Sequence, residues 1–206
     1  MSLLRWLHRS RVAERRTRVL GEALAPLLPE GAQVLDVGCG DGAVAAQIAR
    51  LRPDLTLRGI DVHVRDTTAI PVEAFDGRRI AAAEDSYDVI VLVDVLHHAR
   101  DPVALLREAA RVSRRWLVLK DHTCESRFAA RRLAWMDRVG NPPGEVEILA
   151  DYWPRARWAA VISELGLRVD VWQARVPLYP PPVDWLFGRG LHFVARLEVP
   201  GEAAGA

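Results

Sequence analysis

The sequence predicts a single α/β domain built on a mostly parallel sheet, and three observations lead to this fold class. Apolar runs typical of buried strands alternate with helix-like segments over most of the 206 residues. A glycine-rich turn, "VLDVGCGDG" at residues 34–42, follows the first of these runs and opens a helix. The last two strand-like segments alternate in polarity, which is typical of an antiparallel pair.

The first half of the chain is expected to form two helices and three strands. Leucines and valines spaced three to four residues apart indicate an N-terminal helix, which "PEGA" at 29–32 ends. A short apolar run before the glycine turn indicates a buried strand, and a second strand ends at Asp61. The helices are expected over 3–28 and 42–51, and the strands over 33–37, 55–62 and, weakly, 69–75.

The second half contains the clearest strand of the sequence, the continuous apolar run "DVIVLVDVL". The helix after it has Asp101 as a candidate N-cap and Pro102 at its first position. The segment "PLYPPPVDWLFGRG", 177–190, is too long and proline-rich for a tight hairpin. Strands are expected over 88–96, 115–121, 167–176 and 191–199, helices over 101–112 and 155–166, and a frayed tail over 201–206.

The charge of the chain is nearly balanced overall and uneven locally. The net charge is +1, which gives no global electrostatic case for nucleic acid or membrane, whereas residues 1–20 hold six arginines and one glutamate. The Arg-rich helical segment 1–28 therefore has three interpretations, in this order: a lid over a ligand, a solvated surface, and a peripheral contact with an anionic membrane.

Cysteine content and hydropathy favour a cytoplasmic protein. The two cysteines, Cys39 and Cys124, make no disulfide framework and are expected to be reduced thiols. No apolar run approaches the roughly 18 residues of a membrane span, and the N-terminus has no apolar signal-peptide core.

The glycine turn is a candidate nucleotide site, because it joins a strand to a helix. Taken alone it is ambiguous, since Gly38, Gly40 and Ala43 also satisfy the G-x-G-x-x-A pattern of dinucleotide enzymes. Asp61 suits a ribose diol under either interpretation, because one carboxylate accepts hydrogen bonds from two hydroxyls.

Four motifs in order separate the two interpretations. Asp36 lies two residues before the first of three alternating glycines, an acid closes the second strand, and "YDVIVLVDVLHH" forms the fourth. This set, over about residues 17–120, resembles the class I S-adenosylmethionine-dependent methyltransferases, particularly the small-molecule and quinone methylators. The resemblance implies one three-layer Rossmann-like domain over 1–200, with a seven-stranded sheet in the order 3-2-1-4-5-7-6 and an antiparallel last strand.

The resemblance also implies a set of residues that bind S-adenosyl-L-methionine, whose spent form is S-adenosyl-L-homocysteine. Asp36, Gly38 and Gly40 would border the methionine part, and Asp61 would take the ribose hydroxyls. Asp76 would accept from the adenine amino group, beside the backbone of Gly77. Cys39 has no redox or nucleophilic role in this scheme. The whole set is Asp36, Gly38, Cys39, Gly40, Asp61, Val62, Asp76, Gly77, Val93 and Asp94.

Methyl transfer from a sulfonium is an in-line displacement, so an enzyme mainly aligns the acceptor and excludes water. A base is needed only when the acceptor must lose a proton. His122, with Asp121 as its orienter, is the candidate base, because it follows the fifth strand at the edge where ligands bind. His97 and His98 are expected to cap or pack the turn after the fourth strand, and no metal site is expected.

An insert over residues 122–158 is expected to form the acceptor pocket. Its candidate lining residues are Trp135, Asn141, Tyr152 and Trp153, whereas Trp158 has the helical spacing of a core residue. The predicted function is methyl transfer to a small organic acceptor, with no nucleic acid partner and an unknown oligomeric state. The alternatives are an RNA methyltransferase, a non-catalytic binder of the same cofactor, and a nicotinamide oxidoreductase.

Overall fold

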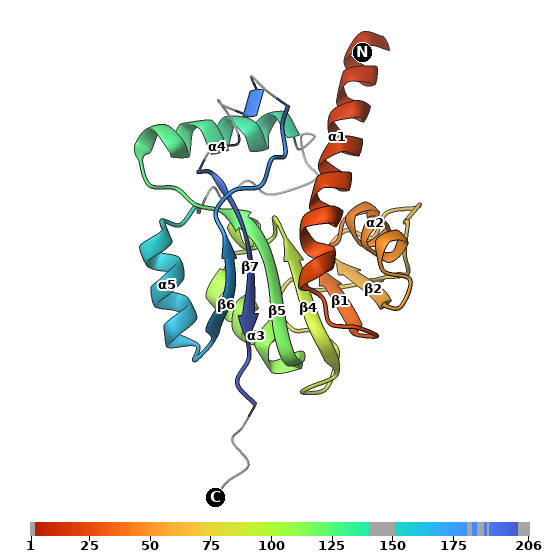
Figure 1. The fold of residues 1–206 in the computed structure, drawn as a ribbon, viewed down its shortest axis with the longest axis vertical. Coiled ribbons are helices and arrows are strands. Elements are labelled where there is room, and N and C mark those ends of the chain that lie inside the picture. Colours follow the sequence, from red (N-terminus) through yellow and green to blue (C-terminus); the bar gives the residue numbers. More distant parts are fainter. Residues whose placement is uncertain (1–2, 141–150, 181–182, 185–187, 189, 202–206) are drawn as a thin grey trace, which may run out of the picture.

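The computed structural model describes residues 3–140, 151–180, 183–184, 188 and 190–201 (Figure 1). Within this part of the chain seven strands form one sheet in the order β3-β2-β1-β4-β5-β7-β6, which confirms the predicted order. β7 is antiparallel to both β5 and β6, and the remaining neighbours are parallel. The strands are β1 Gln33–Val37, β2 Thr56–Asp61, β3 Val72–Ala74, β4 Tyr87–Val93, β5 Ser113–His122, β6 Arg168–Gln173 and β7 His192–Glu198.

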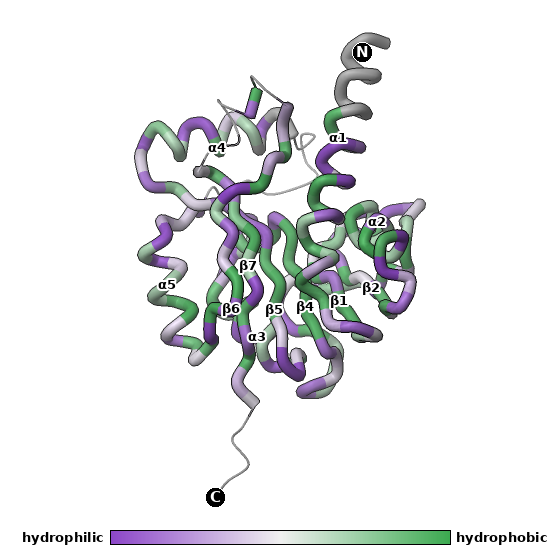
Figure 2. Tube along the Cα trace, viewed as in Figure 1, coloured by the Kyte–Doolittle hydropathy of each residue, from purple (hydrophilic) through white to green (hydrophobic). Residues whose placement is uncertain are grey.

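Helices cover both faces of the sheet and produce the predicted three layers. α1 Leu3–Leu24 and α2 Ala43–Leu51 pack on one face, where Leu20, Leu24 and Ile48 join the inner side chains of the strands. α3 Pro102–Val112 and α5 Arg155–Glu164 cover the other face. Figure 2 shows hydrophobic colouring through β1 and β4 at the middle of the sheet, as strands covered on both faces require.

The carboxyl ends of the parallel strands share one edge, and two further features lie at this edge. α4 Arg127–Gly140 follows β5 and lies across the top of the sheet, while α1 rises beside it (Figure 1). α4 was not predicted from the sequence, although Ala129, Leu133 and Met136 have helical spacing and lie on its inner side. The functional side chains described below gather beneath α4 and α1.

β4 ends three residues before its expected end at residue 96. Asp94 takes a positive φ of 57°, which turns the chain out of the sheet, and a short 3-10 helix over Leu96–His98 follows. Positive φ is uncommon for a residue other than glycine, and it recurs at functional sites. The predicted third strand is also shorter, with only Val72–Ala74 of residues 69–75 paired to β2.

Asp101 caps α3 as expected, because its carboxylate accepts a hydrogen bond of 2.9 Å from the backbone N–H of Ala104. We expect Asp101→Ala to lower the free energy of unfolding by about 1 kcal/mol, since one helix N–H then loses its acceptor. Chemical denaturation measures this change. Asp101→Asn, which keeps an acceptor oxygen, is the control and is expected to stay close to the wild type.

None of the helices among the described residues combines the length and apolar character that a membrane-crossing segment needs. Gly166 ends the α5 segment with a positive φ of 70°, as predicted. The frayed tail was predicted over 201–206, and of these residues only Gly201 lies within the described part.

Candidate active site

The glycine turn between β1 and α2 is shaped by three left-handed glycines. Gly38, Gly40 and Gly42 have φ values of 71°, 60° and 75°, a region that side chains other than glycine rarely enter. The backbone N–H of Gly38 donates to the carbonyl of Ile60 at 2.8 Å, which ties the turn to β2. A Cβ added at Gly38 would lie only 2.6 Å from Cγ2 of Val95. The turn therefore holds its backbone close to the tips of β2 and β4.

Asp61, at the tip of β2, fixes the same turn from the other side. Its carboxylate accepts hydrogen bonds from the backbone N–H of Gly40 at 2.7 Å and of His63 at 2.8 Å. Because the two bonds use different oxygens, each oxygen keeps a lone pair for a further donor. Asp61 is thus oriented by the backbone and still able to accept two hydroxyl groups.

Asp36 lies beneath the turn in an unusual electrostatic environment. Its side chain is almost fully buried, and its Oδ1 has no hydrogen-bond partner among the described residues. Burial and the negative charge of Asp61 raise the pKa of Asp36 to about 7. A buried carboxylate beside another carboxylate is destabilised unless a cation joins them. S-adenosylmethionine carries an ammonium and a sulfonium, so the donor set at this turn fits that cofactor.

The other predicted cofactor residues lie around this turn on the same edge. Burial first, and then the charge of Asp36, raise the pKa of the Cys39 thiol to about 12, which keeps it protonated and unreactive. Asp76 is exposed, and its Oδ1 accepts from the backbone N–H groups of Arg78 and Arg79. Val62 is also exposed, and Val93 is half-buried at the end of β4.

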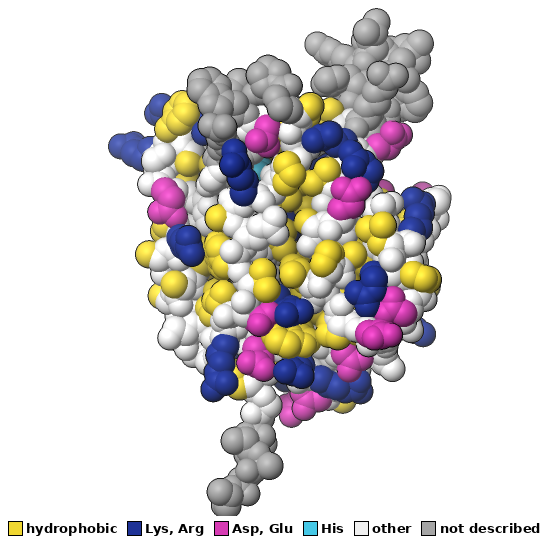
Figure 3. Space-filling view, in the orientation of Figure 1, with side chains coloured by type: hydrophobic (Ala, Val, Ile, Leu, Met, Phe, Trp, Pro, Cys, Tyr) yellow, Lys and Arg dark blue, Asp and Glu magenta, His cyan; other side chains and the backbone are white. Residues whose placement is uncertain are grey.

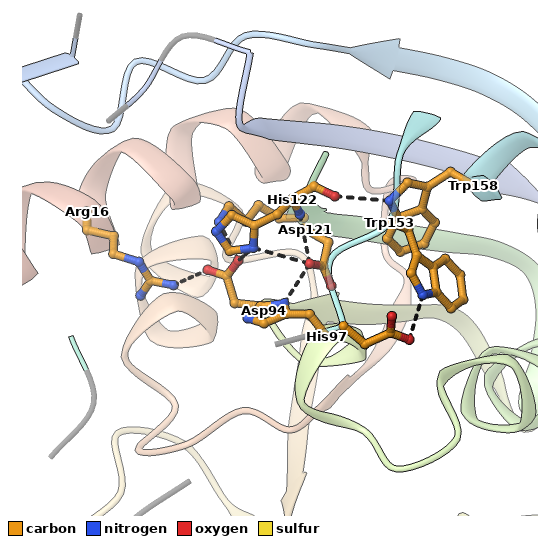
Figure 4. A network of polar contacts seen from close by, with 9 residues as sticks. Arg16, Asp94, His97, Asp121, His122, Trp153 and Trp158 are labelled. Atoms are coloured by element: carbon orange, nitrogen blue, oxygen red, sulfur yellow. Dashed lines mark hydrogen bonds and ion pairs between the residues drawn. The ribbon is translucent and has the colours of Figure 1, made fainter. Parts of the chain in front are cut away.

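Asp94, at the tip of β4, pairs with two cations, of which Figure 4 labels Arg16. Its Oδ2 pairs with the guanidinium of Arg16 from α1, and its Oδ1 pairs with the ammonium of Lys120 from β5. Burial would raise the pKa of Asp94, but Lys120, His122 and Arg16 hold it well below its usual value. Lys120, the only lysine of the chain, is itself buried, and burial lowers its pKa. The contact of Arg16 with this site was not predicted from the sequence.

Asp121 joins two histidines on the neighbouring strand end. Its Oδ1 lies 2.6 Å from Nδ1 of His97, 3.3 Å from Nδ1 of His122 and 2.7 Å from the backbone N of His122. All three side chains are buried. Burial alone would raise the pKa of Asp121, but the two histidines lower it below its usual value. The carboxylate therefore stays ionised and can fix both imidazoles with the proton on Nδ1.

His97 and His98 were expected to cap or pack the turn after β4. His97 is buried in this turn, with its ring centroid 4.0 Å from that of His98, and it also contacts Asp121. The turn closes through backbone bonds from His98 N to Val95 O and from Ala99 N to Leu96 O, at 3.0 and 3.1 Å. The side chain of His97 is therefore not needed to close the turn. It pairs with Asp121 on the neighbouring strand β5. The sequence placed His97 and His122 at the ends of the fourth and fifth strands, but it did not show that both contact Asp121.

Burial first, and then the positive charge of Lys120, lower the pKa of His122 below its usual value. The ring is therefore neutral near pH 7, and Nδ1 faces Asp121 while Nε2 lies on the opposite side of the ring. The ring centroid of His122 lies 4.6 Å from that of His97, 4.8 Å from that of His192 and 5.8 Å from that of Tyr152. A neutral, oriented imidazole among aromatic rings has the properties of a general base.

The predicted acceptor-pocket residues have different surroundings. Tyr152 is half-buried beside both histidines, with its ring 5.5 Å from that of His97. Trp153 is buried in the core, donates from Nε1 to Asp151 at 2.8 Å and packs on Trp158. Trp135 is 53% exposed on the outer side of α4, and Asn141 lies outside the described residues. Trp158 is a core residue, as predicted, and donates to the carbonyl of His122 at 3.0 Å.

α1 contacts the site through two neighbouring arginines. Arg16 pairs with Asp94, whereas Arg15 donates to the carbonyls of Leu178 and Pro177 at 3.2 and 3.3 Å. Val176 and Leu178 pack in the same core layer as Leu20. The second half of α1 and the segment around 176–179 thus form one wall beside the histidines.

Asp94, His97, Asp121 and His122 also place potential metal-ligand atoms within 4.8 Å of one another. Arg16 and Lys120 both pair with Asp94, whereas His97 and His122 contact Asp121. A divalent cation would have to displace at least one of these ion pairs from Asp94.

A family profile described as "Methyltransferase domain" matches residues 6–170. The 27-O-demethylrifamycin SV methyltransferase of Amycolatopsis mediterranei is 29% identical over 53% of this chain and 45% of that protein. A ubiquinone biosynthesis O-methyltransferase of Xanthomonas axonopodis is 32% identical over 42% of this chain and 40% of that protein. The matches thus span less than half the length of these curated relatives.

The fold is also similar to solved structures. A S-adenosylmethionine-dependent methyltransferase of Methanosarcina mazei superimposes with a TM-score of 0.63 over 85% of this chain and 96% of that one, at 16% identity. The strand order, the glycine turn and the family match confirm the resemblance drawn from the motifs. The chain belongs to the methyltransferase domain family, in its S-adenosylmethionine-dependent class I group.

Proposed function

We propose that the protein transfers the methyl group of S-adenosylmethionine to a small organic acceptor that loses a proton in the reaction. The observation that carries this proposal is the adjacency of two sites on one sheet edge. A turn with an uncompensated buried carboxylate, Asp36, suits the cationic cofactor, and the next strand ends hold the Asp121–His122 pair. The curated relatives are named for methylation of a rifamycin and for ubiquinone biosynthesis, which supports a small acceptor.

The cofactor residues in this proposal are those that the family pattern implied. Asp36, Gly38, Cys39 and Gly40 border the methionine part, Asp61 accepts from the ribose, and Val62, Asp76 and Gly77 surround the adenine. Val93 and Asp94 close the methionine end. The carboxylate of Asp94 is paired with Arg16 and Lys120. We therefore assign two roles to Asp94 at the methionine end: its backbone borders the cofactor, and its carboxylate positions Arg16.

When bound, the cofactor supplies a methyl carbon already activated by the sulfonium charge. Nε2 of His122 takes the proton of the acceptor hydroxyl or amine, while Asp121 stabilises the imidazolium that forms. With its proton held by His122, the acceptor atom would be ready to accept the methyl group, and the bound cofactor would leave as S-adenosylhomocysteine with the electron pair of the C–S bond on sulfur. The proton then passes from His122 to solvent. Tyr152 and α1 exclude water from this position, and Trp153 supports the pocket from the core.

The direct test is binding and turnover with the purified protein. We expect S-adenosylmethionine and S-adenosylhomocysteine to bind in calorimetry, and S-adenosylhomocysteine to accumulate with phenol, catechol or amine acceptors. Binding without turnover on any acceptor would favour the non-catalytic alternative. Retention of RNA at two salt concentrations tests the RNA alternative, because phosphate-driven binding falls steeply with salt.

We expect Asp61→Ala to weaken the affinity for S-adenosylmethionine about 100-fold. The change removes acceptors for the ribose and leaves the N–H groups of Gly40 and His63 without their carboxylate, and hydrogen bonds to charged groups contribute about 1.5–3 kcal/mol each. Calorimetric titration measures the effect. Glu73→Ala, an exposed acid on neighbouring β3, is the matched control. Unchanged affinity in Asp61→Ala would remove this residue from the ribose site.

We also propose that the protein acts in the cytoplasm and that α1 serves as a lid or wall of the site. The two cysteines are free thiols, which supports a reducing compartment. The inward contacts of Arg15 and Arg16 support the lid interpretation for the second half of α1. The alternative proposal for the N-terminal segment is a contact with an anionic membrane.

A further inference from the structure

α4 has an exposed stripe in which aromatic and basic side chains alternate. Phe128 and Trp135 are 68% and 53% exposed, and they lie seven residues apart, on one side of the helix. Arg131 and Arg138 follow Phe128 by three and ten residues, so they flank the two aromatic residues, and both are exposed. We call Phe128, Arg131, Trp135 and Arg138 the outer stripe of α4.

The opposite side of α4 is fully used in packing. Ala129 and Leu133 are buried against Leu191, and Met136, Cys124 and Tyr152 pack around them. The sequence of α4 contains four arginines and one aspartate, so the helix is strongly basic in a chain whose net charge is only +1. In Figure 3, basic and hydrophobic side chains gather at the upper left, over the position of α4. The exposed aromatic residues thus lie within a positive surface.

We propose that the outer stripe of α4 docks on an anionic lipid bilayer. Helices that lie in the membrane interface combine Trp or Phe on one side with arginines that contact lipid phosphates, and the stripe has this composition. The guanidinium of Arg132 lies 5.6 Å from the ring centre of Phe128 with its Nε and Nη2 buried, so the charges that the stripe offers to lipid phosphates are those of Arg131 and Arg138. An acidic protein surface would satisfy the charges but would leave Phe128 and Trp135 without an apolar phase.

Docking on this side places the bilayer next to the proposed acceptor site. α4 begins five residues after His122, and its inner side contacts Tyr152, whose ring lies beside both histidines. An acceptor dissolved in the membrane would then need to cross only the thickness of α4 and its neighbours. The docking itself does not depend on methyl transfer, so the two proposals fail independently.

Vesicle co-sedimentation tests the docking, using phosphatidylcholine vesicles with and without 30% phosphatidylglycerol at low salt. We expect the protein to bind only the anionic vesicles and to dissociate as salt rises. Phe128→Ser/Trp135→Ser is expected to reduce the partition coefficient at least tenfold. Each of Arg131→Gln and Arg138→Gln is expected to reduce it about fivefold, which corresponds to about 1 kcal/mol per charge.

The matched control is Leu51→Ser/Val169→Ser, which removes two exposed apolar side chains on α2 and β6, distant from α4. This variant is expected to partition like the wild type, and S-adenosylmethionine binding reports that each variant is folded. Equal partitioning of Phe128→Ser/Trp135→Ser and the wild type would overturn the proposal. A wild type that does not bind anionic vesicles would overturn it as well.

Discussion

Asp36→Asn is expected to abolish tight binding of S-adenosylmethionine and at the same time to stabilise the protein. In the free protein Asp36 is buried, close to Asp61 and without a cation, and its pKa is raised from 3.8 to about 7. Asparagine removes the negative charge that the cationic cofactor needs. Loss of one partner of a buried ion pair costs about 3–5 kcal/mol, so we expect the affinity to fall by at least 100-fold.

The gain in stability follows from the same pKa. The unfolded chain releases the Asp36 proton near pH 4, whereas the folded protein retains it until about pH 7. Stability therefore falls as the pH rises between these values, by an amount of the order of 4 kcal/mol for the full shift. Because asparagine does not ionise, Asp36→Asn is expected to unfold roughly 10 °C higher than the wild type at pH 8.

The pH dependence of binding gives a second measurement on the unmodified protein. If the cofactor binds the ionised form of Asp36, its affinity is expected to rise about tenfold between pH 6 and pH 8, with proton release on binding. Titrations in buffers of different ionisation enthalpy count these protons. S-adenosylhomocysteine keeps the ammonium and lacks the sulfonium. If its affinity depends on pH in the same way, Asp36 contacts the ammonium; if the dependence is lost, Asp36 contacts the sulfonium.

Asp41→Asn is the matched control, because Asp41 lies in the same turn, is exposed, and its carboxylate accepts a backbone hydrogen bond from Ala43 that asparagine can also accept. It is expected to leave both affinity and melting temperature unchanged. A wild-type affinity that stays constant from pH 6 to pH 8 would contradict the assignment of Asp36.

The fold could be predicted from the sequence because its determinants are local. Buried parallel strands require continuous apolar runs, and the glycine turn requires residues that tolerate positive φ, so "QVLDV" and "VGCGDG" are recognisable without any partner. The strand order followed from the family resemblance and not from periodicity. The end of β4 could not be predicted in this way. The backbone turns out of the strand at Asp94, although the residues on both sides of Asp94 are apolar.

The site was predicted less completely, because its contacts join distant segments. Arg16 reaches Asp94 across 78 positions of sequence, and nothing in the spacing of the N-terminal arginines separates it from Arg15 or Arg18. His97 meets Asp121 only because β4 and β5 are neighbours in register. Sequence patterns placed both residues at strand ends but did not show that they pair.

The burial of individual aromatic residues could not be predicted from the sequence either. Trp135 and Trp153 are equally apolar in sequence and were both predicted to line the pocket. Trp153 is buried because Asp151 accepts from its indole and Trp158 packs on its ring, whereas Trp135 faces outward from a helix that was not predicted. Which of two tryptophans meets solvent depends on the orientation of the helix or loop that carries it.

His122→Gln is expected to reduce kcat by about 10²–10⁴-fold with an acceptor that must lose a proton. The glutamine still donates toward Asp121 but cannot take the proton at the position of Nε2. Affinity for S-adenosylmethionine is expected to stay unchanged, since the ring lies at the ends of β5 and β7 rather than at the glycine turn. An acceptor that is already ionised at the assay pH should lose much less activity, and this difference separates a base from a structural residue.

The pH profile distinguishes His122 from its neighbour. Because burial and Lys120 lower the pKa of His122, the acidic limb of kcat is expected below the usual range of histidine. Lys120→Met keeps the shape of the buried side chain and removes its positive charge, so the pKa of His122 rises and the limb moves to higher pH. Arg107→Met, an exposed cation on α3, is the control and should not move it. If His97→Gln rather than His122→Gln abolishes the limb, the base is His97, which the tighter 2.6 Å bond to Asp121 would then explain.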